Sequence, residues 1–402
     1  MPKRILIFSL TYFPFTGGAE VAVREITNRT SRQDIEFDMV TLQFDSALAR
    51  VERVGNVTVH RVGFGRPSPS MADLFAFPLK LNKYLFPVLA YRMARRLHRR
   101  QAYDAIWSIM ANYAGFGALF FKLRNKKVPF LLTLQEGDPV EHIKRRVRFV
   151  SSWFKKIFLS ADVIQAISKH LADFGSYMGH TGKVAVIPNG VDTELFSQQV
   201  PTSELDTLRR SLGLEPHDMV LITTSRLVEK NGVDDCIKAL AHLSDNVKLV
   251  VVGAGPLEKR LKLLAVEFGV ERRVIFTGSV EHHAIPRYLK LADVFVRPSR
   301  SEGMGNSFIE AMAAGLPVVA TQVGGIVDFL FDPDMNRDKK PTGLFAEVRS
   351  PESLARQVKR LLDDDDLRSA ICSNAEEMVS SVYEWDTIAR RMKTEVFAKI
   401  FI

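Results

Sequence analysis

Residues 294–315 read VFVRPSRSEGMGNSFIEAMAAG, and this stretch decides the fold. Its pattern predicts a short buried strand, a glycine-rich loop that holds Glu302, and a helix that opens near Ser307 with Glu310 in its first turn. Gly315 then ends the helix, and an apolar strand follows directly. The stretch is therefore one strand–helix–strand unit of a parallel sheet.

The start of this helix is suited to a sugar that carries phosphate. The backbone N–H groups of Asn306, Ser307 and Phe308, with the positive end of the helix dipole, are expected to hold phosphate oxygens. Glu302 and Glu310 lie eight residues apart on either side of that position. Carboxylates repel phosphate but accept hydrogen bonds from neighbouring hydroxyls of a ribose or hexose. The combination predicts a nucleotide-sugar site.

Each acid also has a simpler interpretation. Ser307 and Glu310 have the spacing of a capping box, so Glu310 could serve only to satisfy backbone donors at the helix start. Glu302, taken alone, could be a solvated loop residue. The remainder of the chain favours the functional interpretation.

Length and composition bound the class of protein. A chain of 402 residues exceeds one ordinary core, and 46% hydrophobic with 25% charged residues is typical of a soluble globular protein, so we expect two domains. Cys236 and Cys372 lie far apart without metal-ligand spacing, which argues against a disulfide framework or a zinc site. The apolar run 5–10 is too short for a signal peptide before Pro14 interrupts. We expect a cytoplasmic protein.

Strand and helix patterns alternate twice along the chain. The first series begins at 4–10, and the second restarts at 219–225 after a polar segment. We predict an α/β fold of two Rossmann-like doubly wound domains facing a cleft. Trp385, Ile388 and Met392 have helical spacing, so the final helix should cross back to the N-terminal domain. The predicted segments are an N-terminal acceptor domain, a linker, a donor-binding domain and the returning helix, at residues 1–196, 197–217, 218–380 and 381–402.

Positive charge is concentrated in the first half. Residues 1–190 hold 28 Lys and Arg against 14 Asp and Glu, whereas the remainder holds 27 against 32. The runs 91–100 and 144–156 mix basic and aromatic residues, as interfacial helices on anionic lipid do. The apolar segment 67–89 contains lysines and internal prolines, which disfavours a membrane span. One hypothesis is peripheral contact with a membrane and the alternative is a solvated helix face; no nucleic-acid-binding module is recognisable.

Two cations follow the first strand of the second half. Arg226 can grip two phosphate oxygens with its planar fork, and Lys230 adds a point charge, so together they could hold a diphosphate against the helix start at Asn306. The alternative is a surface cation pair. The nearby run 253–258 lacks the third glycine of a dinucleotide fingerprint, because Glu258 stands there, and a dehydrogenase is disfavoured.

Two loops of the first half carry further candidates. Gly17 and Gly18 precede a predicted helix and would let the backbone approach a ligand closely, although a turn without a ligand fits equally well. Glu136 and Asp138 follow a buried strand, so they are candidates on the acceptor side, with a plain turn as the alternative.

These motifs together resemble the large retaining glycosyltransferase family four, which has the two-domain GT-B architecture, over essentially the full length. The matching motifs, in chain order, are Gly17–Glu20, Pro188–Asp192, Ser225 and Arg226 with Lys230 and Gly232, Gly253–Pro256, the Glu302 and Glu310 pair, and Gly324 with Gly325. Each motif is short, but their order and spacing are specific.

The resemblance implies a hexosyltransferase that uses a UDP- or GDP-linked sugar as co-substrate, without a cofactor or a divalent metal. It implies that Arg226 and Lys230 neutralise the diphosphate, that Glu302 contacts the donor sugar, and that Glu310 takes the ribose hydroxyls. Transfer would retain the anomeric configuration, with a phosphate oxygen as the base and no protein nucleophile. The other implied donor contacts are Gly17, Gly18, Val280 near the base, Gly303, Met304, Gly305, Asn306 and Ser307.

The acceptor is less defined by the sequence. A lipid-linked or cell-envelope saccharide at the membrane surface is the first hypothesis; a soluble acceptor and a non-catalytic sugar-nucleotide binder are the alternatives. Gln135 stands where many relatives have a histidine that contacts the sugar, and Asp328 stands where a glutamate is usual. Residues 332–340 resemble a polar insertion.

Overall fold

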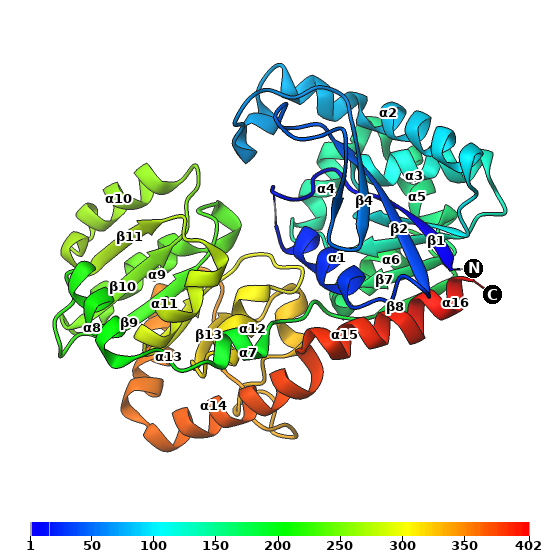
Figure 1. The fold of residues 1–402 in the computed structure, drawn as a ribbon. Helices are drawn as coiled ribbons and strands as arrows, with labels where there is room; N and C mark the ends of the chain where they lie inside the picture. Colours follow the sequence, from blue (N-terminus) through cyan, green and yellow to red (C-terminus); the bar gives the residue numbers. More distant parts are fainter. Residues whose placement is uncertain (1, 16, 402) are drawn as a thin grey trace. The chain divides into compact units, whose positions relative to one another are not determined.

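The computed structural model describes residues 2–15 and 17–401 of the chain. It divides into two compact units, the first made of Met1–Asn189 with Trp385–Ile402 and the second of Gly190–Glu384. Both are parallel α/β sheets covered by helices (Figure 1). The predicted fold class, an α/β fold of two doubly wound domains, is confirmed.

The first unit contains an eight-stranded sheet in the order β3-β4-β2-β1-β5-β6-β7-β8. All neighbouring strands are parallel except β3, which pairs with β4 in an antiparallel hairpin. Central strands of a parallel sheet are buried on both faces, which is why they read as continuous apolar runs in the sequence. The strands are β1 (Lys3–Phe8), β2 (Ile35–Leu42), β3 (Val51–Val54), β4 (Val57–Val62), β5 (Ala105–Ile109), β6 (Phe130–Leu134), β7 (Val163–Ala166) and β8 (Lys183–Val186).

Helices of the first unit form two groups. In one group α2 packs against α3, and α3 against α5; in the other, α1 packs against the returning C-terminal segment. The basic runs found in the sequence lie at the end of α2 and along α4, η2 and α5. The helices are α1 (Gly18–Asn28), η1 (Met71–Phe75), α2 (Leu79–Arg100), α3 (Tyr113–Arg124), α4 (Val140–Val147), η2 (Arg148–Val150), α5 (Ser151–Ser160) and α6 (Lys169–Tyr177).

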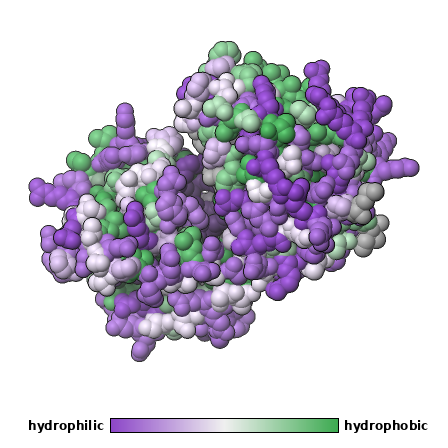
Figure 2. All heavy atoms as spheres, viewed as in Figure 1, coloured by the Kyte–Doolittle hydropathy of each residue, from purple (hydrophilic) through white to green (hydrophobic). Residues whose placement is uncertain are grey.

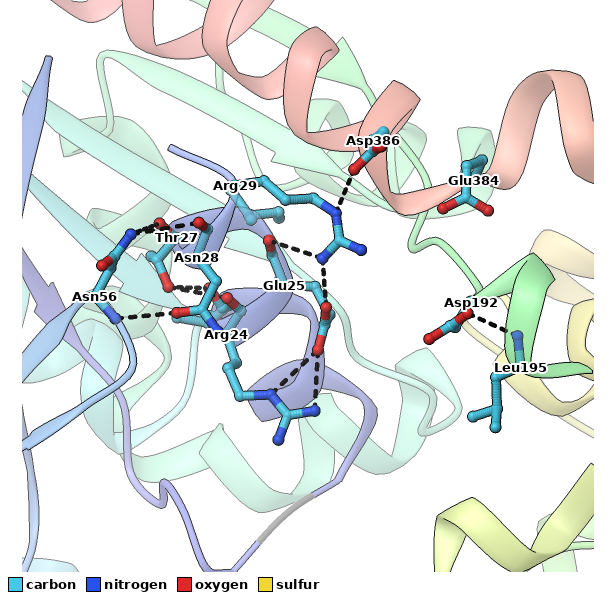
Figure 3. Close-up of polar contacts among 12 residues, drawn as sticks. Arg24, Glu25, Thr27, Asn28, Arg29, Asn56, Asp192, Leu195, Glu384 and Asp386 are labelled. Carbon is cyan, nitrogen blue, oxygen red and sulfur yellow. Dashed lines mark hydrogen bonds and ion pairs between the residues drawn. The ribbon is translucent and has the colours of Figure 1, made fainter. Parts of the chain in front are cut away.

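The C-terminal segment belongs to the core of the first unit, as predicted from its helical spacing. It consists of α15 (Trp385–Arg391), the π-helical turn η9 (Met392–Phe397) and α16 (Ala398–Ile400). The Phe397 ring lies 5.4 Å from that of Trp107 and 6.0 Å from that of Phe37. Arg29, which follows α1, adds a polar link by donating to Asp386 Oδ1 at 2.6 Å (Figure 3).

The second unit contains a six-stranded parallel sheet in the order β11-β10-β9-β12-β13-β14. The quoted stretch supplies β12 and the helix that follows it. The strands are β9 (Met219–Thr224), β10 (Val247–Val252), β11 (Val274–Gly278), β12 (Val294–Arg297), β13 (Val318–Thr321) and β14 (Leu344–Ala346).

Helices of the second unit also form two groups, because α9 packs with α10 and α13, whereas α12 packs with α7 and α14. Asp192 caps α7 by accepting the Leu195 N–H at 2.9 Å (Figure 3). The helices are α7 (Thr193–Ser197), α8 (Thr202–Ser211), η3 (Glu229–Asn231), α9 (Val233–Ala239), η4 (Leu240–His242), α10 (Glu258–Glu267), η5 (Glu271–Arg273), η6 (His282–Ala284), α11 (Ile285–Leu291), α12 (Asn306–Ala313), η7 (Gly324–Asp328), α13 (Pro351–Asp363), α14 (Asp365–Met378) and η8 (Val379–Tyr383).

Two polar segments that the sequence left without a clear role take defined structure in the second unit. Residues 197–217, expected as a linker, include α8, which packs against α11. In the expected insertion 332–340, Asp332 accepts the N–H of Phe345 at 2.8 Å, and Asp334 pairs with Arg360 at 2.6 Å. These residues therefore fix the loop that leads into β14.

The returning segment gives a test of stability. Phe397 is 1% exposed, so Phe397→Ala should remove its packing on Trp107 and Phe37 and cost about 3–5 kcal/mol. Urea unfolding followed by fluorescence should show an earlier first transition. As the control, Phe149→Ala truncates a ring that is 85% exposed and should change the free energy of unfolding by less than about 0.5 kcal/mol. Equal effects of the two substitutions would contradict this role of the C-terminal segment.

Candidate active site

Three loops of the second unit lie at the carboxyl ends of adjacent strands. Residues 225–232 follow β9, residues 298–305 follow β12, and residues 322–325 follow β13. Since β9, β12 and β13 are neighbours in the sheet and run parallel, these loops share one sheet edge. Ligands of open α/β sheets bind at this edge.

Arg297, the last residue of β12, joins the three segments that carry the predicted site residues. Its side chain is 10% exposed and lies over the ring of Phe308, 5.3 Å from the centroid. Nη2 donates to Glu302 Oε2 at 2.6 Å and to Asn231 Oδ1 at 3.1 Å, and Nη1 donates to Ser307 Oγ at 2.6 Å. Sequence reasoning missed this residue. The available signal was an arginine that ends a buried apolar strand immediately before the glycine-rich loop.

Glu302 is held in place from two sides. Its side chain is 10% exposed, with Oε2 paired to Arg297 and Oε1 accepting the N–H of Gly303 at 3.2 Å. Its carbonyl oxygen accepts the N–H of Gly325 at 3.2 Å. Gly324 has φ +54°, and a Cβ there would overlap the Glu302 carbonyl oxygen. The simpler interpretation of Glu302 as a solvated loop residue is therefore wrong, and the paired glycines support its loop.

Glu310 lies elsewhere on the helix than the sequence suggested. Helix α12 starts at Asn306 after Gly305, whose φ is +94°, so Glu310 is past the first turn and that expectation is wrong. The capping-box alternative is also wrong, because Glu310 Oε1 contacts His282 Nε2 at 3.0 Å. The cause is the left-handed Gly305, which starts the helix two residues earlier than a Ser307 cap requires.

The start of α12 differs at Phe308 from the predicted anion seat, which stays a prediction for Asn306 and Ser307. The Phe308 N–H donates to the Gly305 carbonyl at 3.1 Å, so it is not one of the free donors that we expected. Asn306 and Ser307 are the first two residues of α12, at the positive end of its helix dipole. Met304 is buried, and Gly303 and Gly305 complete the turn that leads into them.

The two predicted cations lie on the loop after β9. Arg226 is exposed, and its guanidinium has no hydrogen-bond or ion-pair partner within residues 2–15 and 17–401. Its carbonyl accepts from Asn231 Nδ2 at 2.6 Å, and the carbonyl of Lys230 accepts the N–H of Arg300 at 2.6 Å. Arg300 is itself held by Asp235 Oδ2 at 3.0 Å. The backbone that carries both cations is therefore fixed against the loop after β12.

The loop after β11 connects to the second acid. Val280 is half-buried in this loop, two residues before His282. The His282 imidazole contacts Glu310, and its ring lies 5.6 Å from that of Phe196 on α7. Val280 and Glu310, predicted at the base and the ribose of one nucleotide, are thus linked through His282, which the sequence analysis did not single out.

The glycine pair Gly17 and Gly18 belongs to the first unit. Gly17 caps α1, and its N–H donates to Glu20 Oε2 at 2.7 Å, while Glu20 Oε1 accepts from Thr11 Oγ1 at 2.8 Å. Gly18 is the first residue of the helix. A contact of these glycines with a ligand stays a prediction.

The acceptor-side candidates are tied to the backbone around them. Glu136 Oε1 accepts the N–H of Ala111 at 2.7 Å and Oε2 accepts the N–H of Gln135 at 2.9 Å. Burial raises the pKa of Glu136, and these backbone donors lower it in part. Gln135 Oε1 accepts from Asn189 Nδ2 at 3.2 Å, and Asp138 lies 3.6 Å from Arg146. Glu136 therefore has a structural role in the loop that presents Gln135.

Two family models match the chain in succession. The model described as Glycosyltransferase Family 4 matches residues 16–195, and the model described as Glycosyl transferases group 1 matches residues 205–378. The chain belongs to glycosyltransferase family 4. Its motifs occur in both units, and in the second unit Asn231, Glu302 and Ser307 bind Arg297.

Relatives of this family 4 chain include named enzymes. A GDP-mannose-dependent alpha-(1-6)-phosphatidylinositol monomannoside mannosyltransferase of Mycobacterium tuberculosis is 34% identical over 60% of this chain and 63% of its own length. A D-inositol 3-phosphate glycosyltransferase of Xylanimonas cellulosilytica is 30% identical over 61% of this chain and 58% of its own length. The chain thus spans less than two thirds of these relatives.

Among solved structures, a sucrose-phosphate synthase from Thermosynechococcus elongatus superposes with a TM-score of 0.81. The match covers 99% of each chain at 22% identity. At this identity the likeness establishes the fold of the family 4 chain.

The support of Glu302 by the paired glycines can be tested in the family 4 chain. Gly324→Ala adds a left-handed strain of about 1–2 kcal/mol and also a Cβ that overlaps the Glu302 carbonyl, so nucleotide-sugar binding should weaken at least tenfold. Gly269→Ala is the control, because Gly269 has φ +66° and no atom lies near the position of its Cβ. This variant should show the backbone strain without the overlap, and its nucleotide-sugar binding should stay unchanged. Calorimetric titration and thermal unfolding of both variants separate the two effects. Equal binding by both would show that Gly324 does not position Glu302.

Proposed function

We propose that the chain transfers a hexose from a nucleotide-diphosphate sugar to an acceptor, with retention at the anomeric carbon. The observation that carries the proposal is the Arg297 ion pair that fixes Glu302 beside the start of α12. Membership of family 4 supports the reaction class, and the printed name of the M. tuberculosis relative, GDP-mannose-dependent, supports a nucleotide sugar as donor.

In this proposal the diphosphate lies between the cations and the helix start. Arg226 and Lys230 neutralise its charge, and the N–H groups of Asn306 and Ser307 with the helix dipole hold its oxygens. Fixed cations of this kind stabilise a leaving diphosphate as a bound metal would, so transfer is proposed to be metal-independent.

In the same proposal the two acids bind the sugar and the nucleoside of the nucleotide sugar. Glu302 accepts hydrogen bonds from the donor sugar, with Oε1 turned to the Gly303 N–H and Oε2 to Arg297. Glu310 accepts from the ribose hydroxyls, and the loop with Val280 faces the base. Gly17 and Gly18 of the first unit are proposed to approach the phosphates.

The chemical step requires no protein nucleophile. The acceptor hydroxyl oxygen bonds to the anomeric carbon on the face from which the nucleotide departs, and the bond from that carbon to the phosphate oxygen breaks. The electron pair of that bond goes to the nucleoside diphosphate, and a phosphate oxygen takes the hydroxyl proton. The positive charges on Arg226 and Lys230 stabilise the developing charge.

For the acceptor, the first unit supports a saccharide at a membrane surface. Figure 2 shows apolar side chains gathered on the part of the surface where Figure 1 places η1 and α2. Phe75, Phe77 and Phe149 are 66%, 82% and 85% exposed and lie near basic residues of α2 and α4. We propose a cytoplasmic protein that binds peripherally to the inner face of a membrane. None of the helices in the described part of the chain has the length and apolar character to span one.

Two other functions remain as competing candidates. A soluble transferase would use the same donor site with a free sugar or a polysaccharide as acceptor. A non-catalytic binder would need the nucleotide contacts but no contact between Glu302 and the sugar, so in that case the ion pair of Glu302 with Arg297 would only fix the loop. The experiments below separate these candidates.

The first experiment measures transfer and nucleotide binding together. Arg226→Ala should lower kcat/KM about a hundredfold or more, since one preorganised charge contributes on the order of 2–4 kcal/mol to the transition state. Glu302→Ala should abolish transfer while UDP or GDP still raises the melting temperature. The control Arg260→Ala removes an exposed arginine of α10 and should leave transfer and nucleotide binding unchanged. A tenfold or smaller effect of Arg226→Ala would contradict its role, and a wild type without transfer or donor hydrolysis would favour a binder.

The second experiment tests the proposed binding to a membrane surface. Purified protein should sediment with vesicles of anionic lipid at low salt and be released as salt rises, because the attraction is electrostatic and screened. Phe149→Ser, at an 85% exposed ring, should weaken sedimentation without altering nucleotide binding. If the wild type does not bind the vesicles at any salt concentration, the proposal of membrane binding is wrong and the soluble transferase is favoured.

A further inference from the structure

Positive charge without enough counter-charge is concentrated along α2 and α3. Residues 75–135, which include both helices, contain 11 Lys and Arg but a single acid, Asp104. That acid is already engaged, because it accepts from Lys3 Nζ at 3.2 Å and from the Arg4 backbone N–H at 2.8 Å. A basic residue at the end of a helix complements the helix dipole and needs no ligand. The excess here is larger than two helix ends require, so this surface favours an anion from outside the chain.

The ends of α2 and α3 border a recess of about 200 Å³. It is lined by three arginines, a histidine and an asparagine: Arg95, His98 and Arg99 of α2, Arg124 of α3, and Asn125 directly after it. Figure 2 shows hydrophilic side chains over the part of the surface where Figure 1 places the end of α2. Pockets for drug-sized molecules measure roughly 300–1,000 Å³, so this recess admits a smaller group.

The guanidinium groups of the recess are available to a ligand. Those of Arg95, Arg99 and Arg124 make no hydrogen bond or ion pair with any residue in the described part of the chain. Arg95 lies over the ring of Tyr91, 5.6 Å from the centroid, a contact that uses none of its N–H groups as hydrogen-bond donors to an oxygen. Three planar forks therefore keep their donors for oxygen atoms of a bound anion.

His98 adds one more donor to the wall of the recess. Its Nδ1 accepts the backbone N–H of Tyr103 at 3.0 Å, so the neutral ring carries its proton on Nε2. Burial lowers the pKa of His98, and Arg4 lowers it further, which keeps the ring neutral at pH 7. The ring is held by stacking on Tyr103, at 6.1 Å between centroids, and by an edge-on contact with Phe121 at 5.2 Å. The Nε2–H group is thus a fixed donor.

The recess lies at the amino edge of the first sheet. Helix α2 ends five residues before β5 begins, and α3 ends six residues before β6 begins. The loops with Gly17 and Glu136 instead follow β1 and β6, at the carboxyl edge of the same sheet. Because β1, β5 and β6 run parallel, these two edges are on opposite sides of the unit. A molecule in the recess is therefore neither the donor nor the acceptor of the proposed transfer.

We propose that His98 and the three arginines of the recess form a second binding site, which takes the phosphate group of a small soluble molecule. A phosphate monoester carries a charge of about −1.5 to −2 and three strong acceptor oxygens, which match several guanidinium forks. A carboxylate has one charge and two oxygens, so it would leave most of these donors unused. The two helix ends oppose an anion with about −0.5 charge each, which is less than the positive charge of the three arginines.

The surface around the recess favours a soluble ligand over a membrane. Among the described residues, the exposed large apolar side chains include Val88 and Phe149 but none that lies between these two in the sequence. Helices that bind at a lipid interface combine basic residues with apolar side chains that enter the membrane. Sugar phosphates and nucleotides are the two sources of a soluble phosphate group that the experiment distinguishes.

The test measures phosphate binding by calorimetric titration of Arg99→Gln and Arg124→Gln. Both side chains are exposed, so both variants should fold as the wild type does. Arg96→Gln is the matched control, because Arg96 is exposed on the same helix but does not line the recess. Arg226→Ala is the second control, since it removes a cation of the proposed donor site and leaves the recess intact. The probes are inorganic phosphate, glucose 6-phosphate and adenosine monophosphate, with acetate as the carboxylate for comparison.

The wild type, Arg96→Gln and Arg226→Ala should bind at least one phosphate probe, and more tightly than acetate. Arg99→Gln and Arg124→Gln should each weaken that binding about tenfold or more, as expected for the loss of a hydrogen bond to a charged group. Tightest binding of glucose 6-phosphate assigns a sugar phosphate, tightest binding of adenosine monophosphate assigns a nucleotide, and equal binding assigns the phosphate group alone; each supports the site. No phosphate binding by the wild type, acetate binding as tight as that of phosphate, or equal binding by Arg99→Gln and wild type would overturn it.

Discussion

The candidate active site of this protein depends on the buried ion pair between Arg297 and Glu302. Both side chains are 10% exposed, so neither charge is balanced by bulk water, and losing one partner would leave the other buried and unpaired at a cost of about 3–5 kcal/mol. The same guanidinium also holds Ser307 and Asn231. This single planar group therefore brings together Asn231 and Ser307, which lie about 70 positions apart in the sequence. Its planar shape fixes the angles of the hydrogen bonds as well as their lengths.

Backbone packing at the strand ends complements this ion pair. Gly232 and Gly324 both have positive φ, and a Cβ on either would overlap a carbonyl oxygen of the loop after β12, that of Pro298 or of Glu302. The loops after β9 and β13 thus press on the loop after β12 from its two sides, as the strand order requires. Gly232 and Gly324 belong to motifs of the family. In this structure their lack of a side chain lets the loops after β9, β12 and β13 pack together.

Much of the fold could be predicted from the sequence because its signals are local. Strands buried on both faces read as apolar runs, and the C-terminal helix shows its buried face through Trp385, Ile388 and Met392. Residues 197–217 were harder, since α8 has no fully buried residue and its polar pattern resembles a linker. Packing of α8 on α11 is a tertiary property that composition does not encode.

The sequence names candidate residues for the site, which stay predictions, but it does not give their contacts. Arg226, Lys230, Glu302 and Glu310 were identifiable from residue type and spacing, whereas the partners Arg297 and His282 were not. The reason is that partner choice depends on the conformation of Gly305, which sets where α12 begins and so which way Glu310 and Ser307 face. One left-handed residue changes a capping pattern into two separate tertiary contacts.

Both units balance their buried guanidinium groups with acids of the same chain. In the second unit Arg297 has its counter-ion in the chain, at Glu302, and Arg300 has Asp234 and Asp235. In the first unit, where basic residues outnumber acidic ones two to one up to residue 190, the buried Arg61 is paired with Glu52. An ion balanced within the chain can orient other side chains, as Arg297 does for Ser307 and Asn231. The excess charge of the first unit therefore lies on exposed basic residues such as those of α4 and η2, whereas the balanced charge at Arg297 preserves the geometry of the candidate site.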